Sequence, residues 1–376
     1  DIAGLTSSGR FERHDPGSLR STRREPQAEE TDLASGHSWF HHLVGFRETT
    51  GDEVRAQLVV DGDVFTSLAN GRTLTYGSLA TPSLAELRAS TTGRPGPLSV
   101  SEIVADVAEL HADPQNEGAL FQVASQFNLL EMVNQHITPE RGVTGYAADR
   151  TQGPACAVAC GAGTIYRNWL VPIGNSIGQS ETTQVDCLTD LGKTLGNDDG
   201  RLWTMTNGYA LATPGGLADI ADRVAEMAPQ DRDVLMGGLR IGIQAGTEVT
   251  LPGAGHLVTQ AYCSALPVGY SNLPLEDWEP FARLVLDAAY EATLLAGVAN
   301  AERTGNKRLY LTLLGGGAFG NVESWILEAM ERAFDRCCDA DLDVAVVSYS
   351  QSRRLKMAYR VNEQISISAA DSAAPQ

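Results

Sequence analysis

The residues best suited to chemistry are four glycines between a predicted strand and a predicted helix. Gly315, Gly316 and Gly317 follow the apolar run 309–314 directly, and Gly320 lies three positions further on. Glycines at such a junction let backbone N–H groups approach an anion, and the N-terminus of the following helix adds a favourable potential. The pattern favours a phosphate or pyrophosphate site, because an ordinary strand-to-helix turn needs only one or two glycines. A tight turn without a ligand is the alternative.

A second candidate anion site lies at the start of a predicted helix. Thr151 is suited to the N-cap and Pro154 to the first turn, with Gln152 and Gly153 between them. The helix itself is expected over 155–169, where Ala, Cys and Gly are frequent. Such small residues indicate close packing against a neighbouring element.

Two predicted strands end near polar residues that suit ligand recognition. The strand expected over 98–107 includes Asp106 near its end, and the strand expected over 118–124 is followed by Ser-Gln-Phe and then Asn128. Binding groups of α/β proteins gather at the carboxyl ends of buried strands. The alternative role for Asn128 is a simple cap on a short helix expected at 129–133.

An alternating α/β frame must hold these segments. Residues 309–314, 323–337 and 342–349 read as strand, helix and strand, which make one βαβ unit around the glycines. The dipeptide Asn207-Gly208 predicts a tight hairpin. Further strands are expected at 54–60, 64–68, 74–76, 203–205, 209–212, 239–243, 248–250 and 256–265, and further helices at 82–88, 217–227 and 278–298.

Composition and charge narrow the possible partners. The 376 residues are 43% hydrophobic, enough for a substantial core, and carry a formal net charge of −19. A surface this acidic argues against binding nucleic acid or an anionic membrane, although backbone amides still bind phosphate locally. No run of about 18 apolar residues occurs, so we expect no membrane-spanning helix.

Cysteine and histidine show no pattern typical of a disulfide framework or a metal site. The six cysteines include no C-x-x-C pair and are expected to be buried, reduced thiols, which favours a cytoplasmic location. His37, His41 and His42 lack a cysteine or acidic partner at ligand spacing, so no metal is predicted. No cofactor is expected.

The glycines also fit a second nucleotide-binding pattern. Gly315, Gly317 and Gly320 match G-x-G-x-x-G, the pattern of dinucleotide-binding turns. That fold expects an acidic residue at the end of the next strand, where this chain has Ser348 and Tyr349. An NAD-dependent dehydrogenase is therefore the weaker prediction.

The order of the motifs resembles the macrodomain family, whose members bind ADP-ribose. Ala105-Asp106-Val107 is similar to the family's Gly-Asp-Ile at a strand end, and the segment 122–128 takes the place of its Val-Asn-Ala-Ala-Asn motif. The segment 314–320, followed by a helix and a strand, matches the family's Ser-Thr-Gly-Val/Ile-Phe/Tyr-Gly motif, with Phe319 as the aromatic residue. The family's run of glycines before the first helix is missing here.

The resemblance implies an α/β fold with three layers, α/β/α, around a mixed sheet, with an N-terminal extension and an inserted α+β elaboration. The polar, charged composition of residues 1–35 predicts a disordered tail. The resemblance implies a single macrodomain-like domain over 36–362, with its core at 98–169 and 256–350 and an insertion at about 175–250, and a flexible tail is expected over 363–376.

The resemblance also implies roles in ADP-ribose recognition. Asp106 would accept a hydrogen bond from the adenine amino group, and Asn128 would face the distal ribose. Backbone amides of the glycine-rich loop would hold the pyrophosphate, and Tyr349 would stack on adenine. The ligand-binding residues predicted in this way are Asp106, Val107, Asn128, Gln152, Gly153, Gly315, Gly316, Gly317, Ala318, Phe319, Gly320, Asn321 and Tyr349.

Hydrolysis of an ADP-ribosyl linkage needs a carboxylate or a positioned water, because the transition state resembles an oxocarbenium ion. Glu131 and Asp149 are the acids nearest in sequence to the ribose-side elements and are the predicted catalytic residues; a solvated surface acid is the alternative for each. Arg167 is able to pair with a phosphate or to form a surface salt bridge.

The sequence leaves three functions open. The first is hydrolysis that releases ADP-ribose from an ADP-ribosylated protein or a related conjugate. The second is a module that binds ADP-ribose without turnover, and the third is a different phospho-ligand enzyme on a similar scaffold.

Overall fold

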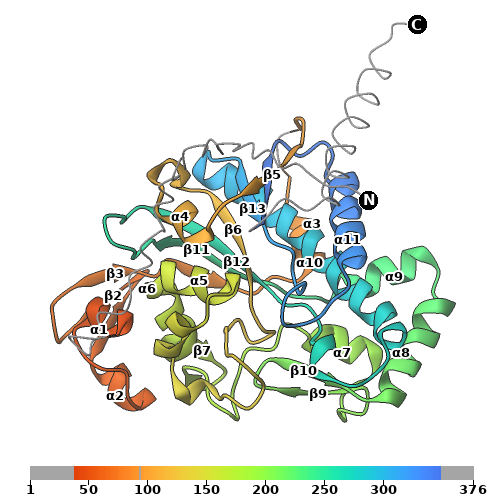
Figure 1. Cartoon of the computed structure of the whole chain (residues 1–376), viewed down its shortest axis with the longest axis horizontal. Coiled ribbons are helices and arrows are strands. Elements are labelled where there is room, and N and C mark those ends of the chain that lie inside the picture. The colour runs from red at the N-terminus through yellow and green to blue at the C-terminus, as the bar shows by residue number, and fades with distance from the viewer. Residues whose placement is uncertain (1–37, 93–94, 349–376) are drawn as a thin grey trace, which may run out of the picture. The chain divides into compact units, whose positions relative to one another are not determined.

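A mixed β-sheet lies at the centre of the structure, a computed structural model that describes residues 38–92 and 95–348 (Figure 1). In sheet order its seven strands are β4 (Ser78–Ala80), β11 (Gly242–Glu248), β12 (Leu257–Cys263), β6 (Leu120–Ala124), β13 (Arg308–Leu311), β14 (Asp343–Ser348) and β5 (Ser99–Val104). The last five run parallel to one another, whereas β11 is antiparallel to both of its neighbours. The predicted α/β class with a mixed sheet is confirmed.

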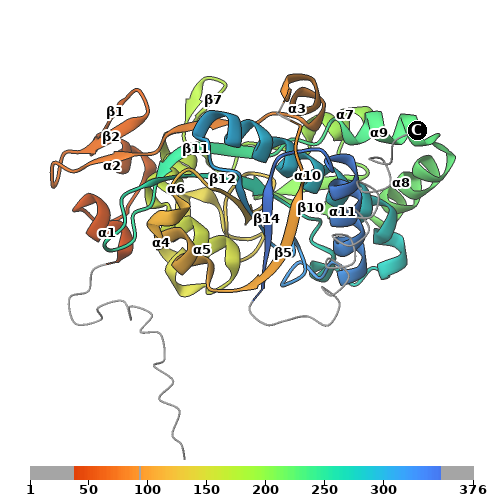
Figure 2. The same cartoon turned by 90° about the horizontal axis from the view of Figure 1, so that it is seen from above.

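Helices cover both faces of this sheet, which gives the three layers that the resemblance implied (Figure 2). One face carries α4 (Val107–Ala112), α5 (Gln152–Ala159) and α6 (Gly161–Ile165), and the other carries α3 (Leu84–Ser90), α10 (Leu275–Thr304) and α11 (Glu323–Arg336). The apolar residues of α11, among them Trp325, Ile326 and Phe334, are buried. This burial of one helix face explains the helical periodicity of the segment.

Smaller elements complete the described part of the chain. These helices are α1 (Trp39–Val44), α2 (Gly51–Ala56), α7 (Thr189–Leu195), α8 (Pro214–Glu226) and α9 (Pro229–Met236), with the turns η1 (Pro114–Asn116), η2 (Pro139–Arg141), η3 (Thr144–Ala148), η4 (Tyr166–Leu170) and η5 (Val268–Tyr270). The remaining strands are β1 (Leu58–Asp61), β2 (Val64–Ser67), β3 (Thr73–Thr75), β7 (Pro172–Ile173), β8 (Ser176–Ile177), β9 (Trp203–Thr206) and β10 (Tyr209–Ala212).

The predicted βαβ unit around the glycines is confirmed. Strand β13 pairs in parallel with β14, with Leu309 opposite Val344, and α11 connects them. The predicted hairpin is confirmed as well, since β9 and β10 pair through the turn at Asn207 and Gly208, both of which have positive φ. Strands β4 and β11 lie outside the segments predicted as the core, so the sheet draws on more of the chain than the resemblance implied.

Two predicted elements differ because polar side chains redirect the backbone. The strand expected at 54–60 begins instead as α2, because Thr50 and Glu53 form a capping box. The strand expected over 98–107 ends at Val104, and Asp106 caps α4 by accepting a hydrogen bond from the Ala108 N–H (2.7 Å).

The remaining differences are breaks in regular structure. The helix expected at 129–133 is an irregular turn, since Leu129 has a φ of 66°. The helix expected over 155–169 starts earlier, at Gln152, and is interrupted at Cys160 before α6 and the π-helical turn η4. The two strands expected at 239–243 and 248–250 are one strand, β11, with a bulge between Gln244 and Thr247.

Burial separates one cysteine from the others. Five of the six cysteines are buried thiols as predicted, but Cys338 is exposed.

Within the described ranges no helix has the length and apolar character to cross a membrane. The same ranges contain no cluster of three or more His, Cys, Asp or Glu residues suited to a metal ion.

Topology brings three chain segments together at one edge of the sheet. Strands β12, β6 and β13 are neighbours and run parallel, so their carboxyl ends at Cys263, Ala124 and Leu311 lie at the same edge. Ligand sites of open α/β sheets form at this edge, between the loops that leave adjacent strands. The glycine-rich loop leaves β13 there.

Candidate functional site

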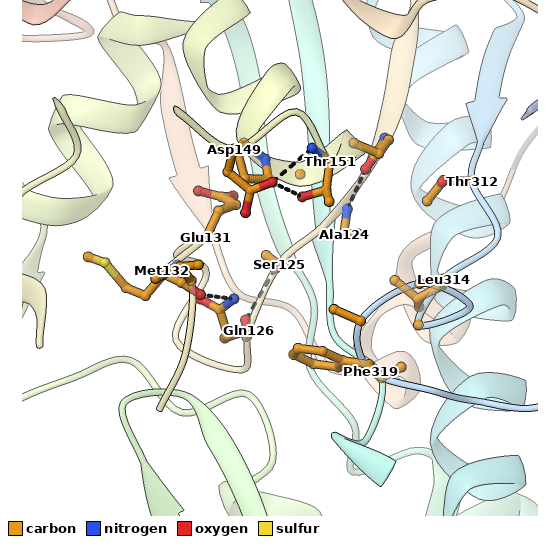
Figure 3. Close-up of a pocket in the computed structure, with 18 of the residues that line it drawn as sticks. Ala124, Ser125, Gln126, Glu131, Met132, Asp149, Thr151, Thr312, Leu314 and Phe319 are labelled. Atoms are coloured by element: carbon orange, nitrogen blue, oxygen red, sulfur yellow. Dashed lines mark hydrogen bonds between the residues drawn. The ribbon is translucent and has the colours of Figure 1, made fainter. Parts of the chain in front are cut away.

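A cavity of about 420 Å³ opens at this edge of the sheet (Figure 3). Its volume lies within the range of about 300–1,000 Å³ typical of small-molecule sites. The lining comes from the loops after β6 and β13, from the start of α5 and from three aromatic side chains. The lining residues are 124–126, 131–133, 149–154, 312–315 and 317–319, with Tyr209, Ala265 and Tyr270.

The glycines after β13 differ in what each one does. Gly315 and Gly320 have φ values of 75° and 70°, and a side chain on Gly315 would overlap Ala265. Gly317 does not have a positive φ, and a Cβ built on it meets no atom within 4 Å. Gly315 and Gly320 therefore shape the turn, whereas Gly317 leaves open space at the wall of the cavity.

Backbone N–H groups of the same loop are available to an anion. The amides of Gly316, Gly320 and Asn321 donate to carbonyl groups inside the loop. The amides of Gly317, Ala318 and Phe319 make no hydrogen bond to any part of the chain that the structure describes. Successive free amides on a glycine-rich turn form a concave anion-binding surface. This arrangement suits the binding of a phosphate group.

The start of α5 forms the opposite wall and is held tightly against β6. A Cβ on Gly153 would overlap the carbonyl oxygen of Ala124, so only glycine fits there. The Gln152 side chain accepts from the Ala124 N–H (2.9 Å) and donates to the Gln122 carbonyl (2.7 Å). Both residues line the cavity, yet each has a packing or bonding role that accounts for its presence.

Glu131 lies in the cavity wall as part of a buried ion pair. Both of its carboxyl oxygens accept from the same Arg167 nitrogen at 3.0 Å, and the two side chains are 1% and 0% exposed. Burial raises the pKa of Glu131 to about 7, and the attraction of Arg167 only partly offsets it. A carboxyl group with this pKa holds or releases a proton near neutral pH.

Arg167 organises the surroundings of Glu131 through its other donors. The guanidinium donates to the Leu129 carbonyl (2.9 Å), the Tyr262 hydroxyl (2.6 Å) and the Thr164 hydroxyl (3.3 Å). It is neither a phosphate ligand nor a surface salt bridge, the two roles that its sequence position allowed. The irregular residues 129–131 are thus fastened to α6 and β12 by one side chain.

Asp149 is the second predicted acid, and it lies at the rim of the cavity. Its Oδ1 accepts hydrogen bonds from the N–H (2.9 Å) and the hydroxyl (2.7 Å) of Thr151. The side chain is half-buried, in contrast to Glu131. In Figure 3 the carboxyl groups of Glu131 and Asp149 both lie on the α5 side of the cavity, and Phe319 lies on the side of the glycine-rich loop.

An aromatic cluster forms another part of the lining. Tyr209 packs against Tyr270 and Phe319 with ring centroids 5.2 and 5.3 Å apart, and Tyr270 meets Phe319 edge to face. Phe319 was predicted as a ligand-binding residue, whereas Tyr209 and Tyr270 were not. The turn signal at Asn207-Gly208 located the hairpin that carries Tyr209, but the sequence did not indicate that this hairpin reaches the site.

Other predicted ligand residues lie outside the cavity lining. Asn128 is fully buried, donates to Gln184 (2.9 Å) and accepts from the Leu130 N–H (3.1 Å), so it supports the loop and does not face a ligand. Asn321 is 5% exposed and donates to the Leu266 carbonyl (2.8 Å). Val107 is buried in the core.

The rest of the predicted set divides by position along the sheet edge. Gly316 and Gly320 belong to the glycine-rich loop but are not among the lining residues. Asp106 is exposed after β5, three strands from β6 and so roughly 14 Å away at the usual strand spacing. Tyr349 lies outside the described residues.

Comparisons with known proteins give weak similarities. No protein-family model matches the chain. No curated protein matches it either. Among solved structures, the poly(ADP-ribose) glycohydrolase of Thermomonospora curvata is 11% identical with a TM-score of 0.38, covering 81% of this chain and 93% of that one. The poly(ADP-ribose) glycohydrolase of Deinococcus radiodurans, in complex with ADP-ribose, is 10% identical with a TM-score of 0.37. The match covers 77% of this chain and 94% of that one.

A third structure is similar over a smaller share of the chain. The IBV X-domain is 15% identical with a TM-score of 0.27, covering 71% of this chain and 99% of that one. These similarities extend over much of each chain but are low.

Replacing Arg167 by Met should destabilise the protein in a pH-dependent way. At pH 8 the variant must either bury an unpaired Glu131 charge or bind a proton there, so the free energy of unfolding should fall by about 3–5 kcal/mol. The pKa of Glu131 is raised in the folded protein, so its ionisation costs stability as the pH rises toward 7, and losing the guanidinium increases that cost. At pH 5 Glu131 is protonated and the loss should be smaller.

Urea unfolding of both proteins at pH 5 and pH 8 measures the difference. The double variant Arg167→Met with Glu131→Gln is the control and should recover much of the stability at pH 8. An equal loss at both pH values would contradict the ion-pair account.

Proposed function

We propose that the cavity binds ADP-ribose or a related nucleoside diphosphate, and that the protein hydrolyses an ADP-ribosyl linkage. One observation carries the proposal. Gly317, Ala318 and Phe319, whose amides are free, line the same cavity as Glu131, whose carboxyl group is buried. The first group suits a diphosphate and the second suits proton transfer near neutral pH.

The diphosphate is bound by backbone and not by cationic side chains. Arg150 is the one Lys or Arg among the residues that line the cavity, and that lining also contains two acids. The N–H groups of 317–319 and the first turn of α5, on opposite walls, supply partial positive charge for an anion between them. This explains how so acidic a protein accommodates phosphate.

The sugar and base extend along the sheet edge in opposite directions from the diphosphate. Phe319 and the neighbouring tyrosines offer an apolar surface for the distal ribose in the cavity that Glu131 also lines. Asp106, further along the edge after β5, is then within reach of the adenine amino group of an extended ligand. Tyr349 remains the predicted stacking partner of adenine.

Hydrolysis follows from the different surroundings of the two acids. Glu131, protonated below about pH 7, donates its proton to the leaving-group oxygen as the bond from that oxygen to the anomeric carbon breaks. Asp149 at the rim accepts a proton from the water that forms the new bond to the anomeric carbon. The products are free ADP-ribose and the hydroxyl or carboxyl group of the released partner.

A second function, binding without turnover, is favoured by one contact. Both oxygens of Glu131 already accept hydrogen bonds from Arg167, so proton transfer must compete with the ion pair. A module that only binds ADP-ribose requires no proton transfer from Glu131, so the ion pair does not hinder it.

Binding is tested by Gly317→Val. A side chain there projects into open space, so the fold should be unaffected while phosphate is excluded. Gly215→Val in the first turn of α8 is a matched control, because its Cβ also meets no atom within 4 Å and it lies outside the cavity lining. Thermal unfolding with ADP-ribose measures the effect, since a ligand of the native state raises the midpoint.

Wild type and Gly215→Val should gain stability with ADP-ribose, about 2.7 kcal/mol at a hundredfold excess over Kd. Gly317→Val should gain none. No gain by the wild type at millimolar ADP-ribose would refute the proposed ligand, and an undiminished gain by Gly317→Val would refute the amide site.

Turnover is tested by Glu131→Gln and Asp149→Asn, assayed for ADP-ribose release from poly(ADP-ribose) and from a mono-ADP-ribosylated protein. Each variant should lose about 10²–10⁴-fold in kcat, the usual contribution of a general acid or base. Wild-type kcat should fall as the pH rises through about 7, because the deprotonated acid is inactive. Binding of ADP-ribose by a wild type without turnover would favour the reader function.

A further inference from the structure

The hairpin β9–β10 contacts the site from the segment predicted as an insertion, and it sends one side chain between the two halves of the cavity. We propose that Tyr209, the first residue of β10, is a positioning residue that couples the Glu131 loop to the glycine-rich loop. This role rests on the proposed function, because it concerns how the Glu131 loop and the glycine-rich loop are kept at a fixed distance and orientation in that site.

One side of the coupling is a hydrogen bond next to Glu131. The Tyr209 hydroxyl donates to the Met132 carbonyl at 2.7 Å, and Met132 directly follows Glu131. The Met132 N–H donates to the Gln126 side chain (2.9 Å), whose amide nitrogen in turn lies 3.1 Å from the Met132 carbonyl. The backbone after Glu131 is therefore held by side chains and not by a helix or strand.

The other side of the coupling is ring packing on the glycine-rich loop. The Tyr209 ring lies 5.3 Å from that of Phe319, tilted by 46°, and the residue is 1% exposed. Phe319 is one of the residues whose amide is free for an anion. A shift of Tyr209 would thus be felt at both the proposed acid and the proposed phosphate donors.

The hairpin is fixed independently of the Tyr209 side chain. The Phe127 N–H donates to the Gly208 carbonyl (3.0 Å), and Asn207 donates to the Gln135 carbonyl (2.8 Å). Gly208 also lies so close to Asn128 that a Cβ would come within 2.5 Å of its oxygen. Changes to the Tyr209 side chain should therefore leave the hairpin in place.

The loop needs such an anchor because its backbone is irregular. No helix or strand covers residues 125–133, and Leu129 has a φ of 66°. Arg167 of η4 and the Tyr146 hydroxyl of η3, which accepts from the Glu131 N–H (3.1 Å), hold the loop at residues 129 and 131. Tyr209 is the anchor on the side of the glycine-rich loop.

Two substitutions separate the two contacts. Tyr209→Phe removes the hydrogen bond and keeps the ring, so the Kd of ADP-ribose should change by less than about twofold while kcat on poly(ADP-ribose) falls about tenfold. Tyr209→Leu removes both, so kcat should fall at least as far and the Kd should rise about fivefold or more. A role in folding alone would not separate Kd from kcat in this way.

Tyr310→Phe is the matched control. Its hydroxyl is a buried donor to Asn116 (2.7 Å) and lies outside the cavity lining, so it should cost similar stability without changing Kd or kcat. Equal kcat values for Tyr209→Phe and Tyr310→Phe, with an active wild type, would overturn the positioning role.

Hydrogen exchange of the unliganded protein tests the coupling without any activity. Amides of residues 126–132 should exchange about tenfold faster in Tyr209→Phe than in wild type, as the loss of one buried hydrogen bond predicts. Their exchange rates should not change in Tyr310→Phe. Unchanged exchange in Tyr209→Phe would overturn the coupling. If the wild type neither binds nor hydrolyses ADP-ribose while this exchange difference is present, the proposed function fails and the coupling stands.

Discussion

The candidate site depends on one buried ion pair. Arg167 is fully buried, and a guanidinium removed from water is tolerated only when its donors are satisfied. It meets that requirement with the Glu131 carboxyl group, the Leu129 carbonyl and two hydroxyl groups. Because these partners come from the loop after β6, from α6 and from β12, the requirements of one charge fix three separate segments.

That constraint explains why an irregular loop is able to present an acid. Loops are usually the most mobile parts of a structure, and a catalytic group must be held within a narrow range of positions. Here residues 125–133 have neither helix nor strand, but their polar groups are bonded to Arg167, Tyr146 and Tyr209. Burial holds the Glu131 side chain in one position, and the same burial raises the pKa of its carboxyl group to about 7.

Periodicity and turn chemistry predicted the elements that depend on local sequence. The βαβ unit around Gly315, the hairpin at Asn207-Gly208 and the long helix α10 are of this kind. Predictions failed where a side chain competes with the backbone pattern, as when Asp106 ends a strand by capping α4, or when Asn128 stabilises a turn in place of a helix. Such competition depends on contacts that periodicity does not encode.

The site was predictable to the extent that it lies at strand ends. The cavity is lined by residues from two distant parts of the chain, Glu131 and Asp149 from one and Gly317 and Phe319 from the other. The sequence did not reveal that Gly153 is required by the Ala124 carbonyl, or that Arg167 pairs with Glu131. Both facts depend on which strands become neighbours, and the order β12–β6–β13 is a tertiary property.

A crystal structure of the protein soaked with ADP-ribose tests the central claim most directly. We expect diphosphate oxygens within hydrogen-bonding distance, about 3 Å, of the backbone nitrogens of Gly317, Ala318 and Phe319. We also expect the distal ribose to lie beside Glu131, with the ion pair to Arg167 retained. Electron density for ADP-ribose elsewhere on the protein, or an empty cavity at saturating ligand, would contradict that claim.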